Sequence, residues 1–424
     1  MTLTRREWLR ATGAGAAAMV LPHVGCGGGE AEATALVLEV DDRRALVSVW
    51  SAAGGSAEVT VETVTGAVHA RERATLGPGG AGVARFDRLA PATAYRARVR
   101  TEDGVDLPPY RFVTAPAADD PRPVRLAIGA DIDPDPAYDS PMFDTLAAAA
   151  ADVYVSLGDW PYADNPPFTR TADNCRFRHV EARAAAKLQP WLTTTSVRAI
   201  YDDHEVRNDW DTATWAADPE LHDTALAVWD EFFPRHEPAE APRYRRWRWG
   251  AHVECFLLDT RRYRSSSKAP DGPTKTMLGA DQRAWLLDGV TTSTAPFKLV
   301  LTSVPLDFGH GVDHWAGYRT ERDAILDALA DAGTPGVLFV SGDQHWYGAY
   351  RHRHGARELQ IGPLARAPFE PPPPLPGVLA TSPEYNVGVV DVDATGLRLR
   401  ALAADGRALH DETVTPDDLR LRRA

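Results

Sequence analysis

Three apolar segments of the chain end in acidic motifs, and these segments decide the fold. They read VYVSLGDWPYAD (residues 153–164), VRAIYDDHEVRND (197–209) and VLFVSGDQHW (337–346). Continuous apolar runs of this length are typical of strands that are buried on both faces of a parallel sheet. In α/β proteins, ligands bind at the carboxyl ends of such strands. The pattern therefore predicts a sheet that carries acidic and imidazole side chains along one edge.

Strands and helices alternate around these motifs from residue 124 onward. We expect strands at 125–131, 153–157, 197–201, 253–259, 298–303 and 337–341, helices at 142–151, 182–192 and 223–232, and late strands at 385–391 and 397–402. Basic and aromatic residues alternate at 243–248, a period of two that favours an edge strand over a cationic binding surface. The sequence thus predicts one large α/β domain at 124–405, followed by a C-terminal tail at 406–424.

The sequence before this domain has a different pattern of predicted secondary structure. Short alternating segments at 35–40, 45–50 and 57–62 are separated by glycine-rich turns, which is typical of an antiparallel β-sandwich. The segment at 89–99 resembles a strand entry of fibronectin type III-like sandwiches. A proline-rich linker at 115–123 ends the segment. We therefore expect a β-sandwich accessory domain at 35–117.

Length and charge limit the classes of function. A chain of 424 residues exceeds one ordinary hydrophobic core, which agrees with two folded units. The formal net charge of −13 argues against a nucleic-acid backbone as the main partner, because that binding requires a cationic surface. No cysteine and histidine spacing typical of a structural zinc site is present.

Residues 1–34 are expected to direct export rather than to fold. The pair Arg5-Arg6 precedes a weakly apolar run at 11–24, as in a twin-arginine signal peptide. Cys26, followed by three glycines, resembles a lipoprotein processing site, with plain cleavage as the alternative. We expect a periplasmic or extracellular protein, lipid-anchored or released, with no transmembrane helix when mature. In an oxidising compartment Cys175 and Cys255 could form a disulfide, but a buried thiol at Cys255 fits its apolar strand equally well.

Four aspartates directly follow separate predicted strands. They are Asp131, Asp159, Asp203 and Asp343. Any one of them could simply cap a helix. Four carboxylates that converge on one edge repel one another unless cations lie between them, and a two-cation centre solves this economically. Oxygen-rich ligands favour hard ions.

The motifs resemble those of the alkaline phosphatase D (PhoD-like) metallophosphoesterases over residues 124–402. The matching segments are Gly158-Asp159-Trp160-Pro161-Tyr162-Ala163-Asp164, Asp202-Asp203-His204-Glu205, Leu258-Asp259-Thr260-Arg261, Met277-Leu278-Gly279 and Gly342-Asp343-Gln344-His345. The resemblance implies a calcineurin-like sandwich of two sheets flanked by helices, with a binuclear centre. It implies Asp159 as the bridging ligand, Tyr162 as a phenolate ligand, Asp203, Asp343 and His345 as further ligands, and His204 as the acid that protonates the leaving group.

The chain departs from the resembling family at one ligand. The family commonly has a cysteine at the end of its first catalytic strand, where this chain has Asp131. The resemblance implies iron and calcium, but the loss of a thiolate shifts the preference toward harder ions, and manganese or zinc are further candidates. Asp133, two residues later, is a second carboxylate that could reach the same ion.

Residues around the centre could contact a phosphate ester. Arg207 and Arg261 are candidate phosphate clamps, with an ordinary ion pair as the alternative, which we favour for Arg261. His310 and His314 are candidate substrate-binding residues in a loop, and surface histidines without a substrate are the alternative. The predicted function is a secreted phosphomonoesterase or phosphodiesterase that uses a hydroxide activated by two metals. Its rival is an exported, noncatalytic, cell-surface binding protein that calcium stabilises.

Overall fold

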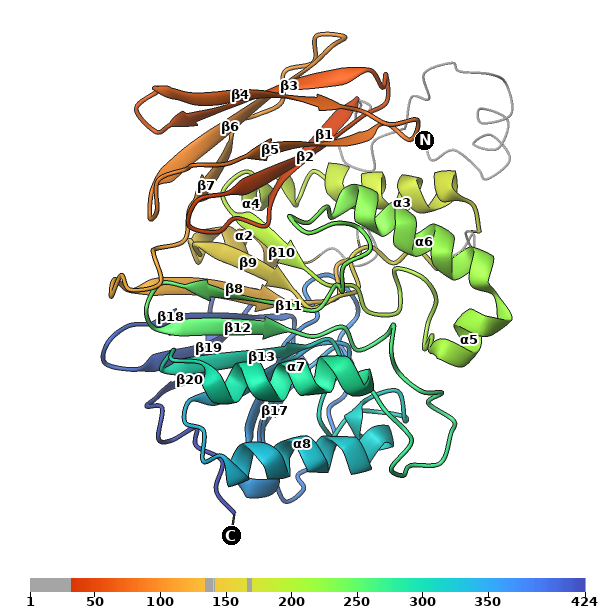
Figure 1. Ribbon diagram of the computed structural model, residues 1–424, viewed down its shortest axis with the longest axis vertical. Helices are drawn as coiled ribbons and strands as arrows, with labels where there is room; N and C mark the ends of the chain where they lie inside the picture. The colour runs from red at the N-terminus through yellow and green to blue at the C-terminus, as the bar shows by residue number, and fades with distance from the viewer. Residues whose placement is uncertain (1–31, 134–139, 141, 166–169, 424) are drawn as a thin grey trace.

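The computed structural model describes residues 32–133, 140, 142–165 and 170–423. Within these residues the strands form sheets of nine, seven and four strands (Figure 1). Residues 1–31 of the predicted export segment, Cys26 among them, lie outside the described residues, whereas Ala33 and Thr34 already belong to strand β1 (Ala33–Leu38). No described helix is long and apolar enough to cross a bilayer.

The nine-stranded sheet carries three of the predicted acidic strand ends. Its strand order is β20-β19-β18-β8-β9-β10-β1-β2-β5, and β8, β9 and β10 run parallel at its centre. The bounds are β8 (Val124–Gly129), β9 (Val153–Ser156), β10 (Ser196–Ala199), β1 (Ala33–Leu38), β2 (Ala45–Ser51), β5 (Ala81–Phe86), β18 (Asn386–Val392), β19 (Leu397–Ala403) and β20 (Ala408–Val414). Most positions in β8, β9 and β10 are buried, as the apolar runs predict.

The seven-stranded sheet carries the fourth acidic strand end. Its order is β11-β12-β13-β14-β16-β15-β17, with β12, β13, β14 and β16 parallel. The bounds are β11 (Arg245–Trp249), β12 (Val253–Leu257), β13 (Phe297–Thr302), β14 (Val337–Ser341), β15 (Tyr347–Arg351), β16 (Arg357–Gln360) and β17 (Val378–Ser382). The basic and aromatic strand β11 lies at the edge, which confirms the period-two prediction.

The main core lies between these two sheets. Apolar side chains from β8 and β9, such as Ile128 and Val155, join those from β12 and β14, such as Leu257 and Val340, in one buried cluster. The outer face of the seven-stranded sheet packs on α7 (Gly279–Thr292) and α8 (Arg319–Asp331). The nine-stranded sheet packs on α2 (Met142–Ala148), α3 (Ala172–Ala184), α4 (Gln189–Leu192) and α6 (Pro219–Phe232), while α5 (Thr212–Ala217) adjoins α6. Two sheets flanked by helices confirm the predicted fold class.

The N-terminal strands form a sandwich that shares a sheet with the rest of the molecule. A four-stranded sheet, in the order β4-β3-β6-β7, packs on β1, β2 and β5. Its bounds are β3 (Ser56–Thr63), β4 (Val68–Thr75), β6 (Ala94–Thr101) and β7 (Tyr110–Val113). The strand β1 continues the central sheet through a short parallel contact in which Leu38 faces Val197. A division of the chain at residues 117–124 therefore stays a proposal.

Buried ion pairs join the sandwich to the larger unit. Glu39 follows β1, is 4% exposed, and pairs with Arg198 at 2.8 Å and with Arg245 at 2.5 Å. Burial alone would raise the pKa of Glu39, but the two guanidinium groups outweigh it and hold the pKa below its ordinary value. Because breaking a buried pair of this kind is strongly destabilising, the sandwich is fixed rather than loosely tethered.

Two sequence expectations about secondary structure are wrong. The helix expected at 182–192 is instead the end of α3 and the separate short helix α4, which has Pro190 in its first turn, where proline is tolerated. The α3 helix begins at 172 because the Thr171 hydroxyl accepts a hydrogen bond from the Asn174 N–H. Residues 406–424 are not a tail: 408–414 form β20, and Leu419 and Leu421 are buried.

The two described cysteines do not form a disulfide. Cys175 and Cys255 are both buried, in α3 and β12 respectively, and no bond joins them. Burial raises the pKa of the Cys255 thiol. The alternative of a buried thiol at Cys255 is therefore the correct one.

Candidate metal centre

The four predicted aspartates meet at one edge of the two sheets. Asp131, Asp159 and Asp203 follow β8, β9 and β10, and Asp343 follows β14 of the facing sheet. Asp131, Asp159 and Asp203 are buried, with Asp131 and Asp159 at no more than 1% exposed, and Asp343 is half-buried. Parallel strands deliver their carboxyl ends to the same edge, and the face-to-face packing of the sheets brings the fourth residue to it.

The backbone of this edge is held in left-handed conformations. The φ angles are 64° at Asp131, 56° at Asp159, 77° at Asp343 and 58° at His345. Non-glycine residues adopt such angles only where the surroundings enforce them. Backbone hydrogen bonds supply this restraint, for example from the Ile132 N–H to the Asp159 carbonyl at 2.8 Å. The side chains are therefore positioned by strained backbone that the fold stabilises.

Ligand atoms gather in three overlapping groups at this edge. The groups are Asp131, Asp159 and His345; Asp159, Asp203 and His204; and Asp202, Asp203 and Asp343, with the atoms of each group within 4.8 Å of one another. Asp159 and Asp203 each belong to two of these groups, and Asp203 also forms a further group with Asp209 and Asp313. Neighbouring groups that share carboxylates are the arrangement that a binuclear centre requires.

Several carboxylate oxygens of these groups lack a hydrogen-bond partner in the described part of the chain. Both oxygens of Asp131 and Oδ1 of Asp203 are buried without a hydrogen bond among the described residues. Burial, followed by the neighbouring carboxylates, raises the pKa of Asp131 and of Asp159 well above the ordinary value. Buried polar atoms are normally satisfied, so a set of unsatisfied carboxylate oxygens fits bound cations. The residues present therefore fit a metal centre.

Tyr162 lies among these ligand atoms. Its phenolic oxygen is 3.2 Å from Asp159 Oδ2 and 3.0 Å from His345 Nε2, and the residue is 1% exposed. The Arg366 guanidinium lies over the Tyr162 ring, 4.4 Å from its centre. The structure thus brings Tyr162 together with Asp159 and His345, as the family resemblance implies.

The orientation of His345 is fixed from outside the cluster. Its Nδ1 lies 2.9 Å from the Ala367 carbonyl, so Nδ1 carries the proton and Nε2 is directed at Asp131 and Tyr162. Burial lowers the pKa of His345 to about 3, which keeps the ring neutral. The Phe369 ring stacks on it at 4.6 Å. A neutral imidazole with a fixed tautomer is the form that binds metals.

His204 lies beside the cluster and has a carboxylate partner. Its Nδ1 is 2.9 Å from Asp164 Oδ1, and its ring centre is 4.3 Å from that of Tyr162. Burial lowers the pKa of His204, but the charges of Asp203 and Asp164 outweigh it and raise the pKa to about 9. Asp164 lies five residues after Asp159 in the same family motif, but the motif alone assigned it no role.

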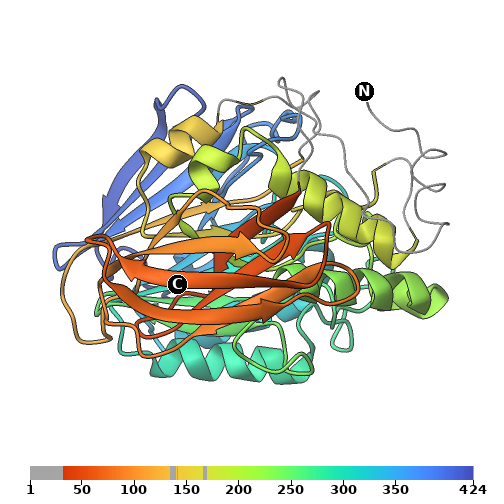
Figure 2. The same cartoon turned by 90° about the horizontal axis from the view of Figure 1, so that it is seen from above.

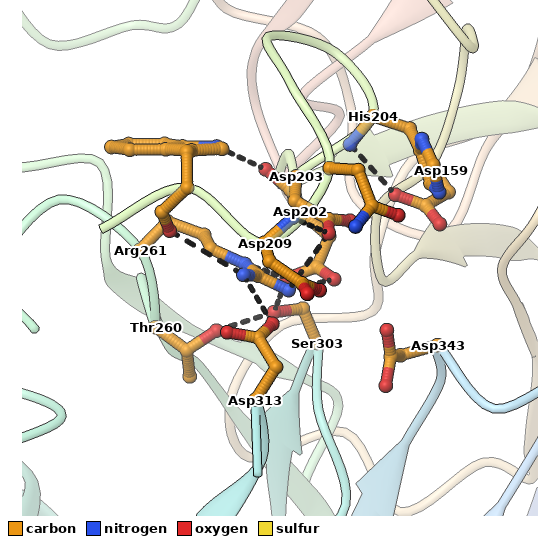
Figure 3. A network of polar contacts seen from close by, with 12 residues as sticks. Asp159, Asp202, Asp203, His204, Asp209, Thr260, Arg261, Ser303, Asp313 and Asp343 are labelled. Carbon is orange, nitrogen blue, oxygen red and sulfur yellow. Dashed lines mark hydrogen bonds and ion pairs between the residues drawn. The ribbon is translucent and has the colours of Figure 1, made fainter. Parts of the chain in front are cut away.

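Two buried acids on the same edge, Asp202 and Asp313, form ion pairs with arginines of the chain. Arg261, 0% exposed, donates from Nε to Asp202 Oδ1 at 2.7 Å and from a terminal nitrogen to Asp313 Oδ2 at 2.5 Å (Figure 3). Arg264 donates to the other oxygen of Asp313 at 2.6 Å. The guanidinium group of Arg261 is thus engaged by Asp202 and Asp313. The structure therefore supports the ion-pair alternative rather than a phosphate clamp. Ser303 donates to Asp202 and so belongs to this set.

The other predicted substrate residues occupy different environments. Arg207 is exposed three residues after His204. His310 is exposed beside the cluster: its N–H donates to Gln344 Oε1 at 2.6 Å and its ring contacts Trp346. His314 is 2% exposed, so its ring offers almost no surface to a substrate.

Two side chains of the loop after β16 were missed. Arg366 covers Tyr162 and pairs with Asp133, which also accepts from Asn165 at 2.7 Å. Asp133 therefore already has protein partners, in contrast to Asp131. No local pattern marks Arg366 or Phe369, since their contacts with the site depend on the tertiary fold.

Comparisons with known proteins agree with this geometry. The PhoD-like phosphatase family matches residues 136–374, more than half of the chain. Alkaline phosphatase D of Bacillus subtilis (strain 168) is 24% identical over 212 residues, which cover 41% of this chain and 35% of that relative. The aligned part is thus about a third of the relative's length.

Two solved structures share the fold. A structure of PhoD superposes with a TM-score of 0.77 at 16% identity, covering 92% of this chain and 91% of that one. Purple acid phosphatase PPD1 from yellow lupin (Lupinus luteus) superposes with a TM-score of 0.66 at 12% identity, covering 92% and 77%. The clustered acids and His345, together with this similarity of fold, are consistent with a metal centre on a metallophosphoesterase fold. The chain belongs to the PhoD-like phosphatase family.

Proposed function

We propose that the chain is an exported, metal-dependent hydrolase of phosphoric monoesters, diesters or both. The observation that carries this proposal is the set of unsatisfied carboxylate oxygens on shared, overlapping ligand groups in a PhoD-like phosphatase. A structural calcium site would require only one such group. Neighbouring groups joined through Asp159 and Asp203 support catalysis by a pair of ions.

The ligands divide into two sets around Asp159. Asp131, Tyr162 and His345 would hold one ion with Asp159, and Asp203 and Asp343 would hold the other. Ions bound there supply Lewis acidity, lower the pKa of water and offset the charge of phosphoryl oxygens. A phenolate and carboxylates favour iron at the first set and a hard ion such as calcium or manganese at the second, and zinc is a further candidate.

His204 has the contacts of a proton donor. Asp164 engages Nδ1, so Nε2 is the atom that can pass a proton to the departing alcohol. The same contact holds the ring against Tyr162 and so orients Nε2. Arg207, exposed close to His204, can contact the phosphate group of a bound ester.

Hydrolysis assays on metal-analysed protein test the proposal. We expect turnover of p-nitrophenyl phosphate, bis-p-nitrophenyl phosphate or both, and a loss of more than about 100-fold in Asp159→Asn, because ligand loss should cost at least as much as loss of a residue that supports a ligand. Asp259→Asn is the matched control, a buried aspartate after β12 that belongs to none of the ligand groups. Metal-loaded protein without activity on either ester would contradict the proposal and favour the noncatalytic, calcium-stabilised alternative.

Export by the twin-arginine route and lipidation at Cys26 are part of the proposal. Both rest on residues 1–34 of the sequence. Mass spectrometry of the mature protein tests them. A diacylglyceryl mass on Cys26 would support an anchor, whereas a free amino terminus beyond Cys26 would rule it out.

A further inference from the structure

The outer face of the four-stranded sheet is rich in arginine. Alternate residues of β3 and β6, such as Val59, Val61 and Val99, point into the sandwich core, so the residues between them point outward. The outward residues include six arginines, which we call the arginine face: Arg71, Arg73, Arg96, Arg98, Arg100 and Arg111. Only Arg96 among them is half-buried, and the other five are exposed.

The pairing of the strands brings these cations close together. Arg73 and Arg100 flank Glu58 on β3, Arg71 and Arg98 flank Thr60, and Arg96 faces Arg111 directly. Directly opposed like charges destabilise a sheet. The face therefore carries a charge pattern that its own stability does not require.

The acids nearby neutralise only part of this charge. Arg98 pairs with Glu62 at 2.9 Å and Arg100 with Asp106 at 3.2 Å, and both arginine side chains remain more than half exposed. Among the residues that the structure describes, the guanidinium groups of Arg71, Arg73 and Arg111 have no hydrogen bond or ion pair. These three cations can bind an external anion without breaking an internal contact.

An exposed apolar pair lies at one end of the arginine face. Val64 and Val68, in and after the turn between β3 and β4, are 50% and 48% exposed. Val68 is opposite Glu62, and the Arg96 guanidinium donates to the Val64 carbonyl, so the pair adjoins the cations. A soluble polyanion offers such side chains no contact, whereas a lipid surface accepts apolar groups beside basic ones.

We propose that the arginine face, with Val64 and Val68, docks on a membrane surface that contains anionic phospholipids. The chain as a whole has a formal net charge of −13, so an anionic surface attracts this face while it repels most of the molecule. The face lies at the top of the molecule in Figure 1, away from the seven-stranded sheet, and Figure 2 views the sheet from that side. Docking through it leaves the strand ends that carry Asp159 and Asp343 uncovered.

Vesicle co-sedimentation of the full-length chain tests this inference. We expect binding to vesicles of phosphatidylcholine with about 30% of the anionic lipid phosphatidylglycerol, and much weaker binding to phosphatidylcholine alone. The variant Arg71→Gln/Arg73→Gln/Arg111→Gln should bind on the order of 100-fold more weakly, since each basic residue near such a surface contributes a factor of about five. The matched control Lys268→Gln/Arg319→Gln/Arg351→Gln removes the same charge from exposed residues elsewhere and should bind as the wild type does.

The outcomes separate a lipid surface from other partners. Val64→Asn/Val68→Asn should weaken vesicle binding at high salt, where screening leaves the apolar contact dominant. Equal losses in the two triple variants, or equal binding to both vesicle types, would overturn the inference. Tighter binding to soluble polyphosphate than to vesicles, with no effect of the valine changes, would also overturn it and identify a polymer as the partner.

Discussion

Asp131 and Asp259 are both fully buried and both follow apolar strands, yet their surroundings are opposite. Both oxygens of Asp131 lack a hydrogen bond among the described residues. Asp259 accepts from the Tyr201 hydroxyl at 2.6 Å and from the backbone N–H groups of Arg261 and Arg262. The sequence pattern is the same, so the difference lies in the partners that the fold supplies.

The contrast extends to the regions around these residues. Near Asp259, the acids Asp202 and Asp313 form ion pairs with Arg261, a cation that the protein itself supplies. Near Asp131, neither Asp131 nor Asp159 has an arginine or lysine partner among the described residues, whereas Asp203 in the same cluster lies 3.6 Å from the Arg261 guanidinium. Buried charge is tolerated only when it is compensated, so the first region is compensated by the protein itself, whereas the carboxylates of Asp131 and Asp159 would be compensated by bound ions.

The largest expected effect concerns the histidine at the border of the metal region. His204→Asn should lower turnover by about 10²- to 10⁴-fold, the usual contribution of a general acid, while the bound metal stays unchanged. His204 also lies within ligand distance of Asp159 and Asp203. Steady-state kinetics with elemental analysis checks this, and a parallel loss of metal and activity would make His204 a ligand instead.

Removal of the Arg261 guanidinium should destabilise the region around Asp202 and Asp313. Arg261→Met leaves Asp202 without a counter-charge and Asp313 with Arg264 alone, and we expect a loss of about 3–5 kcal/mol in the free energy of unfolding. Denaturant titration measures it. Arg398→Met, which removes an exposed arginine paired with Asp411, serves as the control and should leave the midpoint almost unchanged. Similar shifts for both variants would refute a special role for Arg261.

A smaller loss of turnover is expected for Asp164, which acts by orienting His204. Asp164→Asn keeps a hydrogen-bond acceptor near Nδ1 but removes the charge, so turnover should fall by about 10- to 100-fold, the range for residues that orient a site. The KM should change little, because Asp164 does not need to touch the substrate. A large rise in KM with unchanged turnover would contradict this assignment.

The smallest effects compare the two aspartates directly in metal-free protein. Asp131→Asn should leave the free energy of unfolding unchanged or raise it by about 1 kcal/mol, because it removes a buried carboxylate without partners. Asp259→Asn should lower it by about 1–3 kcal/mol, because its partners lose a charged acceptor. Thermal unfolding after chelation measures both, and equal destabilisation would remove the proposed contrast.

Much of the fold follows from local patterns. Apolar runs predict the central strands, alternation predicts the sandwich and the edge strand β11, and the strand-end rule predicts that Asp131, Asp159, Asp203 and Asp343 meet. The start of α3 and the break between α3 and α4 were missed, although the Thr171 cap marks the start and Pro190 marks the break. The strand β20 was missed because its alternating residues, ALHDETV, are mostly polar.

Long-range contacts explain the rest. The join between β1 and β10 depends on one pair of residues that lie far apart in the chain, Leu38 and Val197. The roles of Arg261 and Arg366 likewise depend on acids and rings that the fold brings to them. A strand-end aspartate can be recognised in a sequence, but whether it has a partner cannot.

Elemental analysis of purified protein tests the central claim most directly. The wild type and Asp259→Asn should contain the same bound metal, and Asp159→Asn should lose most of it, because Asp159 belongs to two of the ligand groups and Asp259 to none. Circular dichroism spectra of the three proteins confirm that each is folded. Equal metal content in all three would contradict the account, since the unpartnered carboxylates would then not be the ones that bind the ions.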